Sequence, residues 1–176
     1  FYFPSQTILR VIALPDIVAR ADVKITIPSL KTHHHESPVT LGMKNWMGIM
    51  PSILYGEPRY KLHEAGIHQI IVDINKAVGS SLTVIDGSYG MEGEGTSAMF
   101  GGEAVDVSNR LGGFLVIAGK DPVATDCIAT RIISRDWQPV LDDELGTPYY
   151  VHHLRMAYEQ NLGELRKSRI KIHGIP

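Results

Sequence analysis

Residues 28–48 hold most of the side chains that could carry out chemistry. This segment follows a short apolar run and contains Lys31, Lys44, Asn45 and the consecutive histidines His33 to His35. Neutral imidazole is a general base near pH 7 and the commonest transition-metal ligand. A desolvated lysine can act as a base, bind an anion or form a covalent bond. The segment is therefore a candidate site, and the alternative is a solvated loop whose histidines are only neighbours in sequence.

His63 lies near the expected start of a helix over residues 62–78. The positive end of a helix favours neutral imidazole, the form that binds a metal or accepts a proton. His63 is therefore a candidate metal ligand, with a capping or surface position as the alternative. His68 follows five residues later rather than four, so the two rings would not share one helix face as in a zinc motif. We expect His68 to be a capping or surface residue, and His152 and His153 to be structural or solvated.

Carboxylates follow two of the expected strands. Asp86 and Glu92 belong to the glycine-rich stretch 86–96, where the backbone could approach a ligand and carboxylates could hold a hard cation or a basic group. The alternative is a long mobile loop. Asp126 lies in the first turns of a helix that begins at Asp121, where a carboxylate suits the helix dipole. Asp126 reaches the site if this helix directs its amino end there.

Strands alternating with helices must position these residues. The alternation is typical of a layered α/β fold in which a largely parallel sheet is flanked by helices. Ligands collect at the carboxyl ends of such strands. We expect a single domain, and the nearly continuous apolar runs at 82–85 and 114–118 predict parallel strands covered on both faces. The expected strands are 7–12, 23–27, 82–85, 114–118 and 169–172, and the expected helices are 15–20, 62–78, 121–133 and 147–162.

The composition excludes several classes of protein. With 44% hydrophobic and 20% charged residues, the 176-residue chain is globular rather than disordered. A net charge of −2 argues against nucleic acid or anionic membranes as partners. The single cysteine, Cys127, excludes an intrachain disulfide and an iron–sulfur cluster ligated by this chain alone, and we expect it to be buried. No apolar run could span a membrane, so we expect a cytoplasmic protein, and Phe1 in place of methionine predicts a fragment or a processed piece.

Several of these segments, in this order, resemble the family called domain of unknown function 362. The resemblance covers roughly residues 8–176 and departs at Gly95-Thr96, where the family usually has Gly-Pro. Longer members carry an amino-terminal α/β segment, and many carry a ferredoxin-like cluster domain. The resemblance therefore implies that an amino-terminal segment is missing, or that a ferredoxin-like protein is a partner. The matching segments are Ala21 to Pro28, Leu30 to His33, Val39 to Leu41, Lys44 to Gly48, Leu62-His63, Val84 to Gly87, Gly90 to Gly93, and Asp121 to Ala124 with Asp126.

The order Ala-Asp, strand, His, Lys and a later His is also similar to the core of the nickel-pincer lactate racemase family. In that family a histidine moves a proton or hydride, a lysine tethers the pyridinium-derived cofactor, and the later histidine ligates nickel. The similarity implies these roles for His33, Lys44 and His63. The spacing from His33 to Lys44 is one residue longer here, and the amino-terminal Arg and His motifs of the racemases are absent.

The leading hypothesis is an enzyme with redox or racemase-like chemistry and an undefined cofactor, for which a divalent transition metal is a candidate. Its site would hold a small-molecule or anionic ligand at the carboxyl edge of the sheet. The expected roles are acid–base catalysis for His33, anchoring of the ligand for Lys44, binding of the ligand or cofactor for Lys31, Asn45, Asp86 and Asp126, and metal binding for His63 and Glu92.

A second hypothesis is a non-catalytic scaffold domain that binds a ferredoxin-like protein or the missing amino-terminal segment. An exposed apolar patch beside Trp46 and Met47 would favour it, whereas an enclosed pocket around the polar residues would favour the enzyme. A third is an incidental transition-metal site at His33 to His35, of which at most two rings could bind one ion because successive side chains of an extended chain point to opposite sides.

Overall fold

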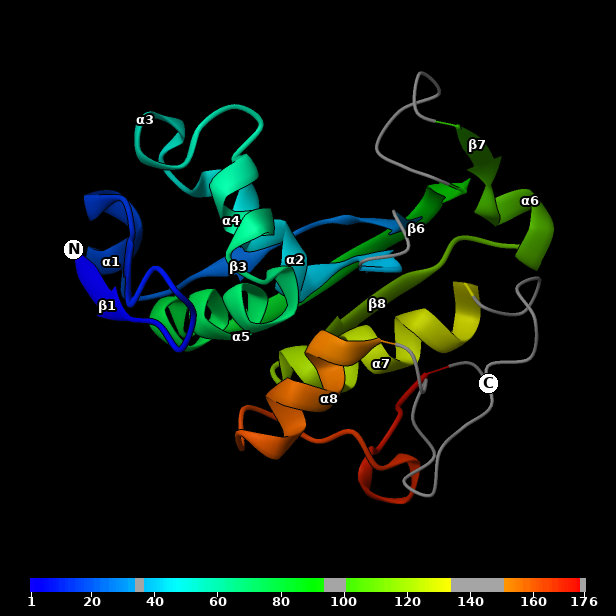
Figure 1. The fold of residues 1–176 in the computed structure, drawn as a ribbon. Helices are drawn as coiled ribbons and strands as arrows, with labels where there is room; N and C mark the ends of the chain where they lie inside the picture. The colour runs from blue at the N-terminus through cyan, green and yellow to red at the C-terminus, as the bar shows by residue number, and fades with distance from the viewer. Residues whose placement is uncertain (34–36, 94–100, 134–150, 175–176) are drawn as a thin grey trace.

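A mixed six-stranded sheet forms the centre of the computed structural model, which describes residues 1–33, 37–93, 101–133 and 151–174 (Figure 1). Its longest strand is β6 (Leu82–Gly93). Along one side of β6 lie the parallel strands β3 (Ile25–Thr26) and β4 (Ser29–Thr32), and along the other lie the antiparallel strands β8 (Val116–Gly119) and β7 (Gly102–Asp106). The predicted α/β class is confirmed: parallel strands form the centre, and antiparallel strands extend it.

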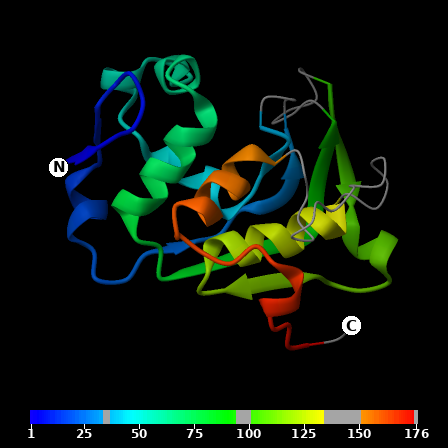
Figure 2. The same cartoon turned by 60° about the horizontal axis from the view of Figure 1, so that its bottom comes forward.

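Helices cover the sheet from one side. Figure 2 shows α7 (yellow-green) beside α8 (orange), with β8 below α7 along the lower side of the molecule. The helix α7 packs on β4, β6 and β8, and α8 packs on both α5 and α7. The helices are α1 (Asp16–Arg20), α2 (Gly42–Asn45), α3 (Ser52–Tyr55), α4 (Tyr60–Glu64), α5 (Ile67–Val78), α6 (Val107–Leu111), α7 (Pro122–Ile133) and α8 (His152–Glu159).

Shorter elements complete the chain. The strand β5 (Val39–Thr40) pairs antiparallel with β4, and β1 (Tyr2–Pro4) pairs with β2 (Val11–Ala13) in a separate two-stranded sheet. Single 3₁₀ turns occupy Trp46–Ile49 and Lys167–Arg169.

The hydrophobic core lies between the sheet and α5, α7 and α8. The apolar face of α5 is fully buried, including Ile70, Ile71 and Ile74, as the three- and four-residue spacing predicts. Asp121 caps α7 as predicted, because its Oδ1 accepts hydrogen bonds from the Val123 and Ala124 N–H groups, both at 2.9 Å. Cys127 is buried in this core, as expected.

Two predicted elements are broken where the backbone adopts a left-handed conformation. The predicted strand 7–12 is wrong except at its end, because Arg10 has φ +58° and strand pairing begins only at Val11. The predicted helix 62–78 is two helices, since Gly66 between them has φ +104°. His63 therefore lies in the last turn of α4 and not near the start of a helix. The expectation that the positive end of a helix favours the neutral form of the His63 ring was wrong.

The glycine-rich stretch that was predicted as a loop is largely strand. β6 continues through Gly93 because β4 and β7 hydrogen-bond to its two sides, with a register shift between Asp86 and Gly90. Gly90 permits the close approach of β4, since a β-carbon there would overlap the carbonyl oxygen of Leu30.

Three other predictions, on a strand, a helix and the covering of the sheet, had different outcomes. The predicted edge strand 169–172 is wrong, since a 3₁₀ turn occupies its start and no strand forms there. The helix predicted from Thr147 is present as α8, but its expected start lies outside the described residues. The predicted covering of the sheet on both faces is not found in the described part of the chain: Ile25 and Val116 are 48% and 63% exposed on the face away from the helices.

Tyr55 joins the two-stranded sheet to the core, because its hydroxyl accepts the buried N–H of Ala13 at 2.6 Å. Tyr55→Phe leaves this N–H without its acceptor and should lower the free energy of unfolding by about 1–3 kcal/mol. Urea denaturation followed by circular dichroism measures the change. Tyr89→Phe is the control, since Tyr89 is 67% exposed; equal losses in the two variants would contradict the assigned role.

Candidate functional site

Asp126 fixes the start of α2. Its two carboxylate oxygens accept the N–H groups of Gly42 and Met43, each at 2.8 Å, and its side chain is completely buried. Burial raises the pKa of Asp126 to about 7; the two N–H donors oppose this rise, and the nearby Asp121 carboxylate adds to it. The residue predicted to bind a ligand therefore uses both of its oxygens on the backbone of this chain.

Two amides hold the rest of α2. The Asn75 side chain of α5 donates to the carbonyl oxygens of Met43 and Ile71, both at 2.8 Å. The Asn45 side chain donates to the Thr26 hydroxyl of β3 at 2.9 Å. The segment that carries Lys44 is thus attached to α5, to α7 and to the sheet.

Lys44 of this segment lies near a group of histidines. It is only 7% exposed, and its charge is one of those that act on His153 of α8. The His153 ring is fully buried and lies 6.2 Å from the His68 ring, nearly parallel to it, while the His68 and His152 rings are 5.1 Å apart. We call His68, His152 and His153, with Lys44, the histidine cluster.

His153 is neutral in the folded protein. Burial lowers its pKa to about 3, and the charges of His68, Lys44 and His152 lower it further. Neither ring nitrogen hydrogen-bonds to any described residue. This cluster was not predicted from the sequence. The available signal was that His153 precedes Leu154 and lies four residues before Ala157, on the apolar face of α8.

Lys31, His33 and Glu92 lie where β4 and β6 end. Lys31 pairs with Met91 of β6, and the His33 N–H donates to the Pro38 carbonyl at 3.0 Å. Paired residues share a face of the sheet and successive residues alternate. Lys31 therefore lies on the face opposite to Glu92, although both belong to the same edge.

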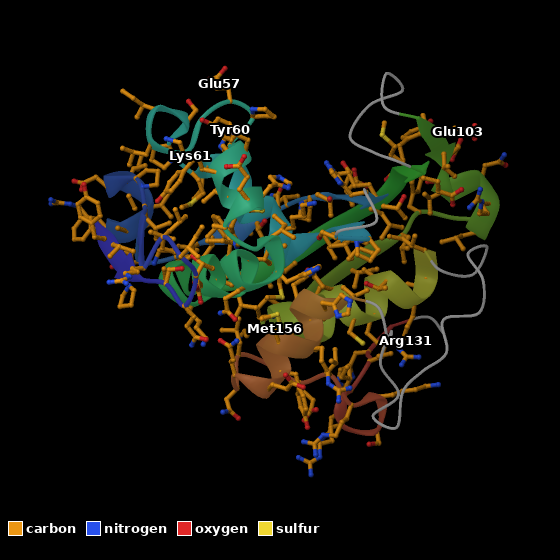
Figure 3. The ribbon with its side chains drawn as sticks, in the orientation of Figure 1. Glu57, Tyr60, Lys61, Glu103, Arg131 and Met156 are labelled. Carbon is orange, nitrogen blue, oxygen red and sulfur yellow. The ribbon has the colours of Figure 1, made fainter. Side chains whose placement is uncertain are left out.

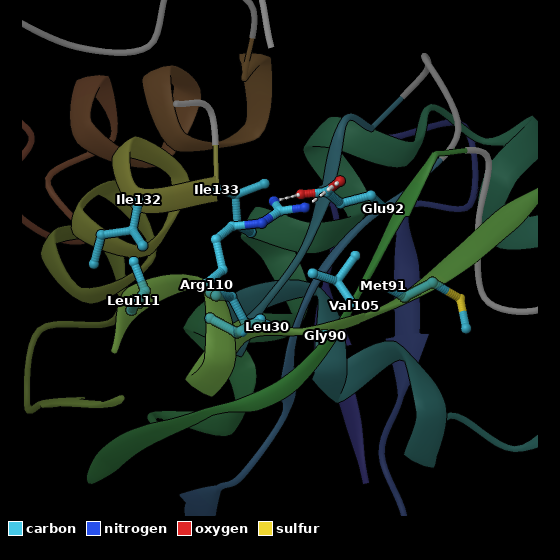
Figure 4. A pocket seen from close by; sticks show the side chains of 10 residues that line it. Leu30, Gly90, Met91, Glu92, Val105, Arg110, Leu111, Ile132 and Ile133 are labelled. Carbon is cyan, nitrogen blue, oxygen red and sulfur yellow. Dashed lines mark hydrogen bonds and ion pairs between the residues drawn. The ribbon is translucent and has the colours of Figure 1, made fainter. Parts of the chain in front are cut away.

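A cavity of about 250 Å³ adjoins Glu92 on the helical side of the sheet. Arg110 of α6 forms an ion pair with Glu92 at its mouth, and Figure 4 shows the two side chains pointing toward each other while Met91 points away. The second guanidinium nitrogen is 3.5 Å from the other carboxylate oxygen. The lining residues are Leu30, Gly90, Met91, Glu92, Val105, Val107, Arg110, Leu111, Ile132 and Ile133.

Two predicted site residues lie elsewhere. Asp86 is exposed on β6 and accepts the Ser88 N–H at 2.8 Å; this hydrogen bond lowers its pKa. His63 lies on α4, which packs on α3 and α5. In Figure 3, Tyr60 of α4 and Glu103 of β7 lie on different sides of the molecule. Glu103 is the residue of β7 that pairs with Glu92. The two predicted metal ligands, His63 and Glu92, are therefore not brought together.

None of the predicted metal sites is assembled among the described residues. Residues 1–33, 37–93, 101–133 and 151–174 contain no group of three or more His, Cys, Asp or Glu side chains that could hold a metal ion. His34 and His35, which belong to the predicted His33 to His35 site, lie outside them. None of the described helices is long and apolar enough to cross a membrane.

The structure is thus an α/β domain with a small cavity near the carboxyl ends of two parallel strands. The chain belongs to the family named Domain of unknown function (DUF362), whose family model matches residues 2–131. The chain is also similar to Thylakoid-associated protein sll1697 of Synechocystis sp. (strain ATCC 27184 / PCC 6803 / Kazusa), with 31% identity over 122 residues. The match covers 66% of this chain and 34% of the relative, so the chain spans about a third of that protein. No solved structure matches this chain.

Gly42 tests the attachment of α2. A β-carbon at this position would overlap the Thr83 side chain and lie 2.9 Å from Asp126 Oδ1. Gly42→Ala should therefore lower the free energy of unfolding by about 1–3 kcal/mol, the usual cost of overpacking. Gly48→Ala is the matched control, because no atom lies within 4 Å of its added carbon. Guanidinium denaturation measures both, and a Gly42→Ala protein as stable as the control would contradict the close packing.

His153 and Asp126 give opposite pH dependences. Unfolded His153 takes up a proton near pH 6.5 and folded His153 only near 3, so its contribution to stability falls as pH drops through this range. Asp126 titrates near 3.8 when unfolded and near 7 when folded, so its contribution falls as pH rises from about 4 to 7.

Replacing either His153 or Asp126 should leave the pH dependence of stability that the other residue causes. Between pH 4 and 6.5 the stability of His153→Leu should fall with rising pH, and that of Asp126→Asn should rise, each by at most about 1.4 kcal/mol per pH unit. Thermal unfolding at a series of pH values measures the slopes. His173→Leu, at an exposed position, should follow the wild type. Slopes of the same sign in His153→Leu and Asp126→Asn would refute the assignment.

Proposed function

We propose that this domain is the ligand-binding part of an enzyme and that it binds a small organic anion in the cavity beside Glu92 and Arg110. The observation that supports the proposal is the position of the cavity. It adjoins Leu30 of β4 and Gly90 to Glu92 of β6, which are parallel strands, near their carboxyl ends. Ligands of α/β sheets collect at such ends.

The chemistry of the cavity matches an anion with an apolar body. Its floor is formed by aliphatic side chains such as Leu30, Val105 and Ile133, and Arg110 supplies a cation at the mouth. The Glu92 and Arg110 side chains are 30% and 44% exposed. Ion pairs this exposed contribute only about 0–1 kcal/mol, so a ligand carboxylate could replace Glu92 at small cost. A guanidinium binds a carboxylate through two parallel hydrogen bonds.

The catalytic groups expected from the sequence are His33 and Lys44, and neither lines the cavity. His33 directly follows β4, the strand that contributes Leu30 to the cavity, and Lys44 is buried on α2. Acid–base catalysis by His33 and a role of Lys44 as anion clamp or covalent anchor therefore require a ligand that extends beyond the cavity residues. The proposal also includes ligand or cofactor binding by Lys31, Asn45 and Asp86. A metal bound through His63 or Glu92 is a further, secondary part.

The scaffold hypothesis has less support. It expected an exposed apolar patch beside Trp46 and Met47, but these side chains are 8% and 7% exposed and belong to the core. A ferredoxin-like partner would therefore have to use another surface.

Benzoate tests the anion site, since it combines a carboxylate with a small apolar body. Isothermal titration should show benzoate binding that is weakened at least tenfold by Arg110→Gln and strengthened by Glu92→Gln, which removes the competing carboxylate. Arg155→Gln is the matched control, because Arg155 pairs with Glu159 on α8, far along the chain from the cavity residues. Benzoate affinity that is unchanged in Arg110→Gln, or equal binding of neutral benzamide, would refute the proposal.

A further inference from the structure

A second cavity, of about 600 Å³, lies between β8, α7 and the C-terminal segment, which is red in Figure 2. This volume is within the usual range of ligand pockets. We call it the edge cavity. Its lining comes from residues 114–121, from four residues of α7, from Glu164 and from residues 169–174. Among the described residues, Ile132 alone also lines the cavity beside Arg110, so the two cavities are separate sites.

The edge cavity runs along the outer edge of β8. All of residues 114–121 line it, although the side chains of a strand point alternately to opposite faces. A cavity that contacts consecutive residues must reach the strand along its edge, where the backbone groups are. In the described part of the chain β8 pairs with β6 alone, so its other edge has no neighbouring strand.

Val116 and Ala118 supply the backbone groups of this edge. The Gly87 N–H donates to the Leu115 carbonyl at 2.9 Å, so Leu115 directs its hydrogen-bonding groups toward β6. By the two-residue repeat of an antiparallel ladder, Ile117 does the same, and Val116 and Ala118 direct theirs away from β6. No described residue hydrogen-bonds to these outward groups. Such a row of donors and acceptors is a template for an added strand.

Cationic side chains line the edge cavity on two sides. Lys120 follows β8, while Arg169 and Lys171 belong to the C-terminal segment with one residue between them. No described carboxylate forms an ion pair with Lys120 or Lys171. Arg169 lies 3.9 Å from Glu164 with its side chain 63% exposed, which is a weak pair that an anionic ligand can replace.

The two carboxylates of the lining already have partners. Asp121 accepts three backbone N–H groups at 2.7–2.9 Å. Glu164 accepts the Arg166 guanidinium through both oxygens, each at 2.9 Å, and these hydrogen bonds lower the pKa of Glu164 to about 2. The edge cavity therefore presents an excess of positive charge.

We propose that the edge cavity binds an extended acidic peptide, which adds to β8 as a further strand. The peptide main chain hydrogen-bonds to Val116 and Ala118, as in other cases of strand addition to a sheet edge. Its side chains alternate between two sides. Apolar residues contact α7, where Ile128 and Ile132 line the cavity, and acidic residues lie near the cations. The proposal is independent of ligand binding beside Arg110.

A short fluorescein-labelled peptide in which valine and glutamate alternate tests the proposal. Fluorescence polarisation should show binding of this peptide and at least tenfold weaker binding of the peptide in which valine and lysine alternate. Only every second N–H of an added strand faces β8. N-methylation of the valines alone or of the glutamates alone should therefore abolish binding in one of the two cases and not in the other.

The double variant Lys120→Gln, Lys171→Gln should bind the acidic peptide at least fivefold more weakly. Both side chains are exposed, so the fold should be unaffected. Lys61→Gln is the matched control, because Lys61 is exposed on α4, outside the edge cavity. Absence of peptide binding at millimolar concentrations, or unchanged affinity in the double variant, would overturn the proposal. Displacement of the peptide by an equal concentration of glutarate would also overturn it and would identify a site for small anions.

Discussion

The bond between the Asp126 carboxylate and the backbone of α2 determines how the candidate site is built. A short helix of four residues cannot be stable by itself. Two of its N–H groups donate hydrogen bonds to the Asp126 side chain of α7 and, together with the Asn75 and Asn45 amides, hold it against the sheet. Lys44 is buried as a result, and its charge lowers the pKa of His153. Gly42 makes the contact possible, because a β-carbon there would overlap the Thr83 side chain and lie 2.9 Å from Asp126 Oδ1.

This arrangement places several ionisable groups where their charged forms are disfavoured. Asp126 and His153 are both fully buried, and burial shifts the pKa of each toward its neutral form. Strongly shifted groups are commoner at functional sites than elsewhere, although structural networks also produce them. The cavity at Arg110 has the opposite character, since its ion pair is partly exposed and can exchange. The domain thus combines a rigid buried polar centre with an accessible cavity.

The elements with strong local signals were predictable. The spacing of Ile70, Ile71 and Ile74 predicted α5 and its end at Val78 but not its start, and the cap at Asp121 predicted α7 close to its observed bounds. Gly66 and Arg10 were harder to interpret, because a left-handed residue ends an element without changing the surrounding hydrophobic pattern. The strand character of residues 86–93 depends on β4 and β7, which pair with it from both sides. Hydrogen bonds between segments distant in sequence leave no local pattern.

The sequence by itself determined the α/β class, the burial of Cys127, and the two-sided apolar character of β6. These properties follow from side-chain periodicity and from the turn preferences of single residues. Only the tertiary structure decided that Asp126 binds backbone rather than ligand, that Lys44 lies close enough to His153 to lower its pKa, and that Glu92 pairs with Arg110. Each of these partners comes from a separate helix or strand. Their approach depends on the packing of whole helices against the sheet, which no spacing along the chain records.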